Sequence, residues 1–268
     1  SKLEQYADYM IGILHGDFGT SYVYNRPVTS LIAERIPNTL VITLTSLVIA
    51  IFIGVGIGVL SAIKQYSILD YIFMILALVG VSMPIFWLGL MLVNLFSVQL
   101  GWLPALGMGS MSKGIGDVIS HMVLPCFCLA TIPTATFARI TRSSMLEVIR
   151  SDYIVTARAK GLSERDILYK HALPNALIPI ITVVGNGMGM MLGGTVVIES
   201  VFSIPGIGMY TTSAINNRDY PIVMGGVLFL GAVFSLIMLL VDIIYAFVDP
   251  RIKAQYEGQQ RSWKRRKK

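Results

Sequence analysis

Five long apolar stretches, separated by shorter polar segments, dominate the hydrophobic pattern of this chain. Each stretch has about 20 residues or more, which is enough for a helix to cross the hydrocarbon core of a membrane. Small and bulky apolar residues are mixed within them, without the polar and apolar alternation of barrel strands. The pattern therefore predicts an all-α integral membrane bundle with five transmembrane helices, at residues 39–63, 71–98, 118–138, 176–198 and 220–248.

Composition and charge support a membrane location and predict an orientation. Hydrophobic residues make up 54% of the chain and charged residues only 13%, as is typical of an integral membrane protein. If the polar segment after the third stretch is cytoplasmic, 16 of the 21 Lys and Arg residues lie inside: Lys64, seven within 139–170 and eight within 251–268. Cytoplasmic loops carry such an excess of positive charge. The first residues then lie outside, and we expect a sixth span to precede them.

This orientation divides the chain into three parts. Residues 1–38 form an extracytoplasmic segment, 39–248 the transmembrane domain, and 249–268 a basic cytoplasmic tail. The transmembrane domain contains a cytoplasmic loop at about 139–175 and an outer loop at about 199–220. Most of the excess in the net charge of +6 lies in the tail, where anionic lipid is the expected partner rather than nucleic acid.

Signatures of catalysis and of metal binding are missing from the sequence. There is no G-x-x-x-x-G-K-[ST] phosphate loop, so this chain is not expected to bind ATP itself. His15, His121 and His171 lie far apart in the sequence. Cys126 and Cys128 stand in an apolar stretch without other soft ligands, which favours packing over metal binding. We therefore predict neither a catalytic nor a metal site.

Ionisable residues are almost absent from the centres of the predicted spans. Only Glu199 and Asp242 come close, and each lies near a span end. An ion-coupled carrier or a channel that acts alone needs charged groups inside the membrane. If the chain belongs to a transporter, its energy is expected to come from another subunit.

Glycines and methionines in the fourth predicted span suggest a close helix contact or a pathway. Gly185, Gly189 and Gly193 repeat every four residues, a spacing that lets helix backbones approach closely. Met188 and Met191 are adaptable side chains that suit a surface accepting varied cargo. Packing within a single bundle is the alternative explanation. Elsewhere, Pro84 in the second span and Pro125 and Pro133 in the third permit kinks.

The most elaborate polar sequence lies between the third and fourth predicted spans. Ala157 belongs to a helix-forming run that leads to Gly161, a typical helix stop. Ser163 and Asp166 then predict the start of a second short helix, which we expect to end at Pro174. Two short helices joined at a glycine suit insertion into a groove of a partner. Amphipathic helices lying on the bilayer are the alternative.

This loop resembles the ATPase-docking loop of ABC importer permeases. The family pattern is E-A-A, three residues, Gly, nine residues, then I-x-L-P. Ala157, Gly161, Leu173 and Pro174 fall on it, whereas positions 155, 156 and 171 depart from it. The departing sequence, TARAKGLSE followed by HALPNALIP, is similar to the variant in dipeptide, oligopeptide and nickel permeases.

Further matches to that class run along nearly the whole chain, and the B-type permease subunit is the most similar group. The matching segments are GDFGTSY at 16–22, PNTL at 37–40, GWLPALG at 101–107, ESVFSIPGIG at 199–208, RDYP at 218–221 and DPRI at 249–252, together with Ser82, Pro84, Phe86 and Gly89.

The resemblance implies a type I ABC importer permease in a bacterial or archaeal cytoplasmic membrane. Its expected partners are a second homologous permease, two cytoplasmic ATPases that hold ATP and Mg, and an extracytoplasmic substrate-binding protein. No cofactor is expected on this chain. The expected cargo is a di- or oligopeptide, and the alternatives are nickel, a metal chelate or glutathione.

The resemblance also assigns roles to particular residues. The expected ATPase-docking residues are Ala157, Gly161, Leu162, Ser163, Glu164, Arg165, Leu173 and Pro174. The residues expected to face the binding protein are Pro205, Gly206, Asn217, Arg218 and Asp219. For the latter group, a plain connecting loop is the alternative.

Overall fold

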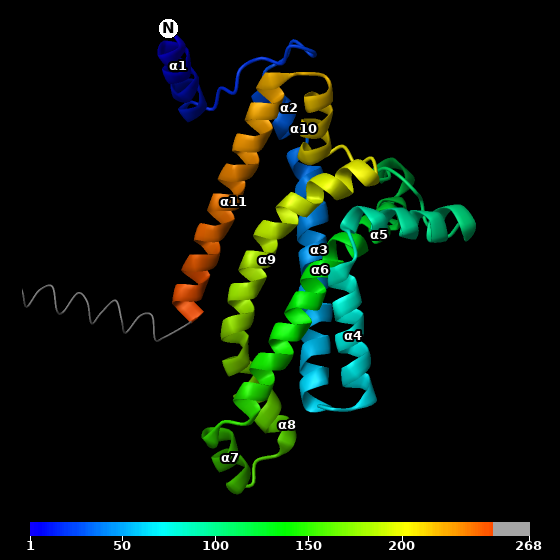
Figure 1. The fold of residues 1–268 in the computed structure, drawn as a ribbon, viewed down its shortest axis with the longest axis vertical. Helices are drawn as coiled ribbons and strands as arrows, with labels where there is room; N and C mark the ends of the chain where they lie inside the picture. Colours follow the sequence, from blue (N-terminus) through cyan, green and yellow to red (C-terminus); the bar gives the residue numbers. More distant parts are fainter. Residues whose placement is uncertain (249–268) are drawn as a thin grey trace, which may run out of the picture.

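The chain folds into an elongated bundle of helices with short helices and loops at both ends (Figure 1). The computed structural model describes residues 1–248, with only the backbone described at Ile178 and at 245–248. The predicted basic tail at 249–268 lies outside the described residues. In chain order the helices are α1 (Lys2–Leu14), α2 (Val28–Ala33), α3 (Ile36–Ile63), α4 (Ile68–Ser82), α5 (Ile85–Leu92), η1 (Val93–Gln99), η2 (Met111–Lys113), α6 (Ile115–Ile149), α7 (Asp152–Ala159), α8 (Glu164–Asp166), η3 (Ile167–Ala172), α9 (Leu173–Val201), α10 (Ile207–Asn216) and α11 (Tyr220–Val248).

Length and hydropathy identify the membrane spans among these helices. Within the described residues, four helical segments are long and apolar enough to cross a membrane: Val28–Ile63, Ile115–Ile149, Pro179–Val201 and Tyr220–Ile244. The bent pair formed by α4 and the α5–η1 helix makes a fifth if it is counted as one span. The predicted all-α membrane bundle is confirmed.

The second predicted span, 71–98, is broken. α4 ends at Ser82, α5 begins at Ile85, and the two helices are bent by 105°. Met83 is extended (φ −85°, ψ 130°), because the following Pro84 crowds it out of the helical region and brings no N–H of its own. The single helix predicted here is corrected to two, and the break falls at the proline that the sequence analysis singled out.

In the centre of the bundle, α3 and α6 lie backbone to backbone. A Cβ added at Gly54 would lie 2.7 Å from the carbonyl oxygen of Thr134, and one at Gly58 would lie 2.5 Å from Cβ of Thr141. Only glycine permits so short a separation between the helices. The main core surrounds this contact and includes Ile42, Leu129, Phe137, Ile198 and Phe202.

At one end, the lower end in Figure 1, the polar loop of residues 150–172 folds against the bundle. Ile154 and Ile167 are buried in a cluster with Ala62 of α3 and Met145 of α6. The π-helical η3 runs directly into α9. The short helix predicted to end at Pro174 therefore continues, and that prediction is wrong. Pro174 lies in the first turn of α9 after a π-helical turn, where its missing N–H is tolerated.

At the opposite end, α2, α10 and the start of α11 build a second small core. Its members are Val28, Leu31, Ile32, Ile207, Tyr210, Ala214 and Ile222. The buried carboxylate of Asp219 holds the loop that precedes α2 against this core. Ser21 Oγ donates to the carboxylate at 2.5 Å, and the amides of Tyr22 and Val23 donate to it at 3.2 Å. α1 has no buried residue and stands apart from the bundle in Figure 1.

Candidate functional site

The turn of the polar loop has the geometry that the sequence predicted. Gly161 has φ +81°, a left-handed conformation that glycine adopts without steric cost. Its amide donates to the carbonyl oxygen of Arg158 at 2.9 Å, and the next amide, of Leu162, donates to Ala157 at 3.3 Å. Ser163 Oγ then accepts from the amide of Asp166 at 3.1 Å, which confirms the predicted helix start.

Two ion pairs brace this turn from within the chain. Arg158 Nε lies 2.7 Å from Glu164 Oε1, and the second guanidinium nitrogen lies 3.1 Å from Oε2. Arg158 therefore lowers the pKa of the Glu164 carboxyl, and Glu164 raises the pKa of Arg158. Lys170 Nζ lies 2.5 Å from Asp166 and, with a hydrogen bond from Ser163, lowers the pKa of Asp166. The negative charge of Glu164 is thus paired with Arg158 of the same loop. Arg165, by contrast, is exposed.

The predicted docking residues divide into an inner and an outer set. Ala157, Leu162 and Leu173 are half-buried and pack against the apolar cluster of the polar-loop end. These three residues therefore stabilise the fold of the loop. Gly161, Ser163, Glu164, Arg165 and Pro174 are exposed.

The loop also exposes apolar side chains that the sequence analysis missed. Tyr153, Val155 and Tyr169 are 46%, 56% and 57% exposed. For Val155 the signal in the sequence is positional: in α7 Ile154 is buried and Ala157 half-buried, so Val155, which lies between them, points away from that face. Exposed aromatic and branched side chains on a folded loop favour contact with another protein.

The glycines of the α9 repeat lie in two different environments. A Cβ at Gly185 would lie 2.1 Å from Val241, and one at Gly189 would lie 2.3 Å from Phe234, both in α11. These two glycines therefore allow packing within the chain, as the alternative explanation held. Gly193 is exposed, and a Cβ there would meet nothing within 4 Å. Met191 is 2% exposed and Met188 packs against the main core.

An exposed face of α9 was predicted only at Gly193. Asn186, Met190 and Gly193 are exposed, and Thr182 and Ser200 continue the same face at helical spacing. Met190 is 76% exposed. The missed signal was Asn186, an amide within the span Pro179–Val201. An amide facing hydrocarbon costs several kcal/mol, so this face is suited to water or protein.

The five residues expected to face a binding protein lie in different environments. Asn217 and Arg218 are exposed at the turn between α10 and α11. Asp219 is 1% exposed and fully engaged within the chain. Gly206 is buried, and the Pro205 carbonyl oxygen accepts a hydrogen bond from Asn38 at 2.9 Å. The structure thus places Asp219 and Gly206 in the interior, where they hold the loop in shape.

Glu199, which the sequence analysis noted as a charge near a span end, is completely buried. Its carboxylate accepts hydrogen bonds from Thr39 Oγ1 at 2.6 Å and from the amide of Met209 at 3.0 Å. Thr39 in turn accepts from the amide of Ile207 at 2.9 Å. These amides belong to the first turn of α10, which has no side-chain cap of its own. Glu199 therefore caps α10 from another helix and ties it to α3 and α9.

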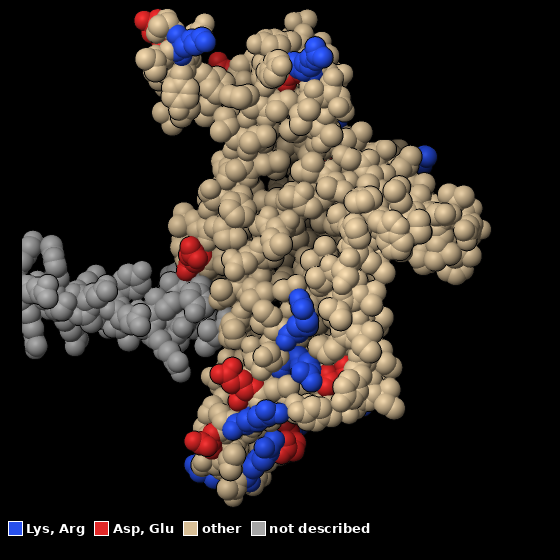
Figure 2. All heavy atoms as spheres, in the orientation of Figure 1, with Lys and Arg blue, Asp and Glu red and all other residues tan. Residues whose placement is uncertain are grey.

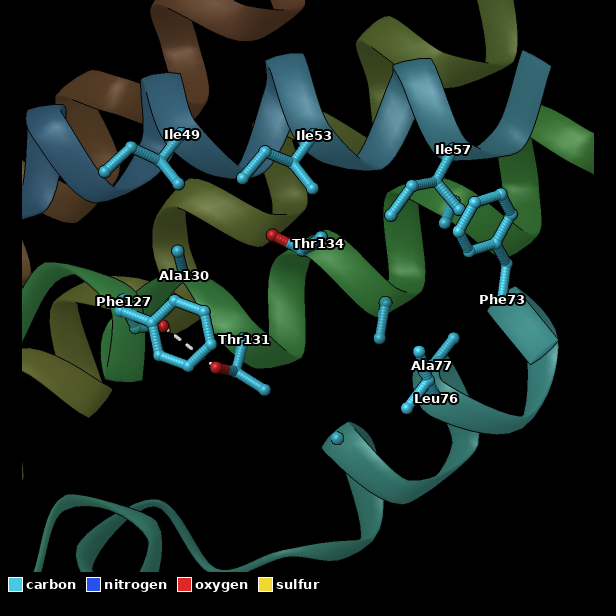
Figure 3. A pocket seen from close by; sticks show the side chains of 13 residues that line it. Ile49, Ile53, Ile57, Phe73, Leu76, Ala77, Phe127, Ala130, Thr131 and Thr134 are labelled. Carbon is cyan, nitrogen blue, oxygen red and sulfur yellow. Dashed lines mark hydrogen bonds between the residues drawn. The ribbon is translucent and has the colours of Figure 1, made fainter. Parts of the chain in front are cut away.

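An apolar cavity of about 210 Å³ lies between α3, α4 and α6 (Figure 3). Ile49, Ile53 and Phe73 point into it, and Thr131 Oγ1 is occupied by a hydrogen bond to the Phe127 carbonyl oxygen at 2.9 Å. A peptide main chain would find few polar partners here. The cavity is therefore a poor candidate for a peptide site.

Charged residues are distributed unevenly along the bundle. Figure 2 shows that the charged residues gather toward the two ends and leave a largely uncharged belt between them. Among the described residues, no group of three or more His, Cys, Asp or Glu is arranged to hold a metal ion. Apolar spans with a braced polar loop at one end define this chain as a multi-pass integral membrane protein.

Comparison with known proteins identifies the family. The sequence profile described as "Binding-protein-dependent transport system inner membrane component" matches residues 54–254, so the chain belongs to this family. It is 47% identical to the dipeptide transport system permease protein DppB of Alkalihalophilus pseudofirmus, over 93% of this chain and 81% of that protein. It is 43% identical to the oligopeptide transport system permease protein AppB of Bacillus subtilis, over 93% and 80%. The chain is a permease subunit rather than an enzyme.

The fold also matches a solved transporter. A structure described as inward-facing conformations of the MetNI methionine ABC transporter superposes with a TM-score of 0.66, over 82% of this chain and 96% of that one, at 20% identity. This likeness confirms the predicted fold class, that of type I ABC importer permeases.

Proposed function

We propose that this chain is the pore-forming subunit of an ATP-driven importer for di- or oligopeptides. The observation that carries this proposal is the extended identity with two peptide permeases, and it is supported by a polar loop that packs against one end of the bundle. Partner ATPases supply the energy, because the sequence contains no phosphate loop. The membrane is the cytoplasmic membrane of a bacterium or archaeon, with the polar loop inside.

The polar loop is the proposed docking site of an ATPase subunit. Its exposed Tyr153, Val155 and Tyr169 enter the groove, while Gly161 sets the angle between the two short helices. The loop is mechanically continuous with the bundle, because η3 runs into α9 and Ile154 is buried beneath α3 and α6. A displacement of the docked ATPases on ATP binding then moves these helices as a rigid unit.

The exposed face of α9 is the proposed peptide pathway. Asn186 and Gly193 mark this face, and a second, homologous permease subunit closes the pathway from the other side. Asn186 offers both a donor and an acceptor to peptide groups, and Met190 adapts to different side chains.

Thiol labelling tests the pathway. Cys126 and Cys128 are buried and give little background. In the assembled complex, Asn186→Cys should react readily with a charged thiol reagent, whereas Phe52→Cys, 76% exposed on the apolar face of α3, should not. Equal reactivity of the two variants would contradict the assignment.

At the other end of the bundle, an extracytoplasmic binding protein delivers the cargo. Asn217 and Arg218 remain the proposed contacts of the predicted set, because they are exposed.

The test of the whole proposal uses the complex reconstituted with its partner subunits in liposomes. ATP hydrolysis and uptake are measured with dipeptides, longer peptides, nickel and glutathione. Accumulation of peptides with stimulated hydrolysis is expected. Stimulation by nickel or glutathione alone would keep the architecture and overturn the peptide assignment.

A further inference from the structure

The strongest additional feature lies at the end of the bundle opposite the polar loop. Arg35 immediately precedes α3 and is half-buried. Its guanidinium carbon lies 5.1 Å from the ring centroid of Tyr210. Among the described residues it has no carboxylate partner, and its Nε is buried without a hydrogen bond. An unpaired, partly buried cation is costly unless a partner supplies the counter-charge.

The carboxylates close to Arg35 in the chain or in space are already committed. Glu34 forms an ion pair with Arg26. Asp219 accepts hydrogen bonds from Ser21 and from two backbone amides. Arg35 is therefore free to take an acceptor from outside this chain.

Tyr210 fixes the arginine in place. The tyrosine is 9% exposed and its hydroxyl has no hydrogen-bond partner. Its ring contacts that of Tyr24, with centroids 5.8 Å apart and an interplanar angle of 36°. Burial raises the pKa of Tyr210 to about 12, and the buried hydroxyl is not accessible to a partner from outside the chain. The contribution of Tyr210 is its ring, which holds the Arg35 guanidinium in position.

An exposed aromatic loop lies beside this pair. Tyr22, Val23 and Tyr24 are 70%, 48% and 49% exposed. The Asp219 carboxylate accepts hydrogen bonds from the amides of Tyr22 and Val23, so the backbone of this loop is fixed before any partner arrives. Rigid Tyr and Arg side chains dominate the energetics of many protein–protein interfaces.

We propose that Arg35 and the loop of Tyr22, Val23 and Tyr24 form a docking patch for an acidic side chain of the extracytoplasmic binding protein. We call it the Tyr–Arg patch. Exposed Arg218 adds a second positive charge at the same end of the bundle. A protein partner fits better than a free peptide, because the aromatic surface is larger than one carboxylate requires. This inference rests on the proposed function.

The test measures ATP hydrolysis by the reconstituted complex as its binding protein is titrated. Arg35→Glu should raise the half-saturating concentration of binding protein by about tenfold or more, since reversing a charge at an interface of this kind places like charges together. Turnover at saturation should stay near that of the wild type. Lys113→Glu is the matched control, because Lys113 is an exposed cation of η2 and lies outside the patch. Arg35→Lys should retain most of the affinity.

Photo-crosslinking identifies the partner. A photo-reactive residue at Tyr22 should yield an adduct with the binding protein. An adduct with the second permease subunit alone would overturn the proposal. A wild-type half-saturation in Arg35→Glu would also overturn it. An affinity loss for free peptides that amidation of their C-terminus reproduces would reassign Arg35 to the cargo.

The two proposals fail in different ways. If the wild-type complex shows no stimulation by any binding protein, the proposed function fails. If the wild type is stimulated and the Arg35 variants behave like it, only the Tyr–Arg patch fails.

Discussion

The two ends of the bundle use their charges differently. At the polar-loop end, Arg158 pairs with Glu164 and Lys170 with Asp166, so these charges brace the loop itself. At the opposite end, half-buried Arg35 stacks on Tyr210 and has no carboxylate partner among the described residues. Charged residues with partners mainly set the shape of a surface, and an unpaired one at a rigid site is available for recognition. We therefore expect contact at the polar loop to depend on apolar side chains, and contact at the opposite end to depend on charge.

The largest effect is expected at the turn of the polar loop. Gly161→Pro should abolish coupled uptake, because proline has a φ near −65° and cannot adopt the +81° found there. The protein should still insert into the membrane. Uptake and ATP hydrolysis by the reconstituted complex are compared with those of Gly161→Asn, which tolerates the left-handed conformation. Normal coupled uptake by the proline variant would remove the docking assignment.

A large effect on stability is expected at the opposite end. Glu199→Leu leaves the Thr39 hydroxyl and an amide of α10 without their acceptor. The loss should be about 1–3 kcal/mol of unfolding free energy, measured by thermal unfolding in detergent. Ser200→Ala, at an exposed neighbour, is the control and should be close to neutral. Equal unfolding temperatures for the two variants would contradict the capping role of Glu199.

The dependence of binding on ionic strength should differ between the two ends of the bundle. Tyr153→Ala on the polar loop should weaken attachment of the ATPase subunit by about tenfold, as expected for loss of an aromatic anchor. Because the lost contact is mainly apolar, the ratio to wild type should change little with ionic strength. Docking at the Tyr–Arg patch should weaken as salt rises. Co-purification of the ATPase across a salt series provides the measurement, and Thr156→Ser is the control.

The smallest effect is a dependence of the polar loop on pH. The pKa values of Glu164 and Asp166 are lowered in the folded loop by Arg158 and Lys170. Their stabilising contribution is therefore present above the ordinary carboxyl pKa of about 4, and it is lost as pH falls through the lowered values. The protection factors of the 160–166 amides, which correct hydrogen exchange for its intrinsic dependence on pH, should thus stay constant from neutral pH down to about pH 4. Protection factors that fall already near pH 6 would show that other groups hold the loop.

Several site features could be predicted because they depend on local chemistry. A residue at the end of a short helix that needs positive φ is best a glycine, which made Gly161 recognisable. Ser163 followed by an acid three residues later marks a helix start in any fold. Pro84 broke its span because the clash lies between adjacent residues. Pro174 misled the prediction, since the π-helical turn before it depends on how η3 packs beneath the bundle.

The sequence by itself determined the membrane class, the approximate spans, the family and the local turns, because apolar length, charge asymmetry and backbone chemistry are encoded over short distances. Only the tertiary structure decided which polar residues face outward. Asp219 is buried, while its neighbour Arg218 is exposed. Gly189 meets α11 and Gly193 meets nothing. Arg35 lies on a tyrosine far away in the chain. These outcomes depend on packing between distant helices, which no local pattern specifies.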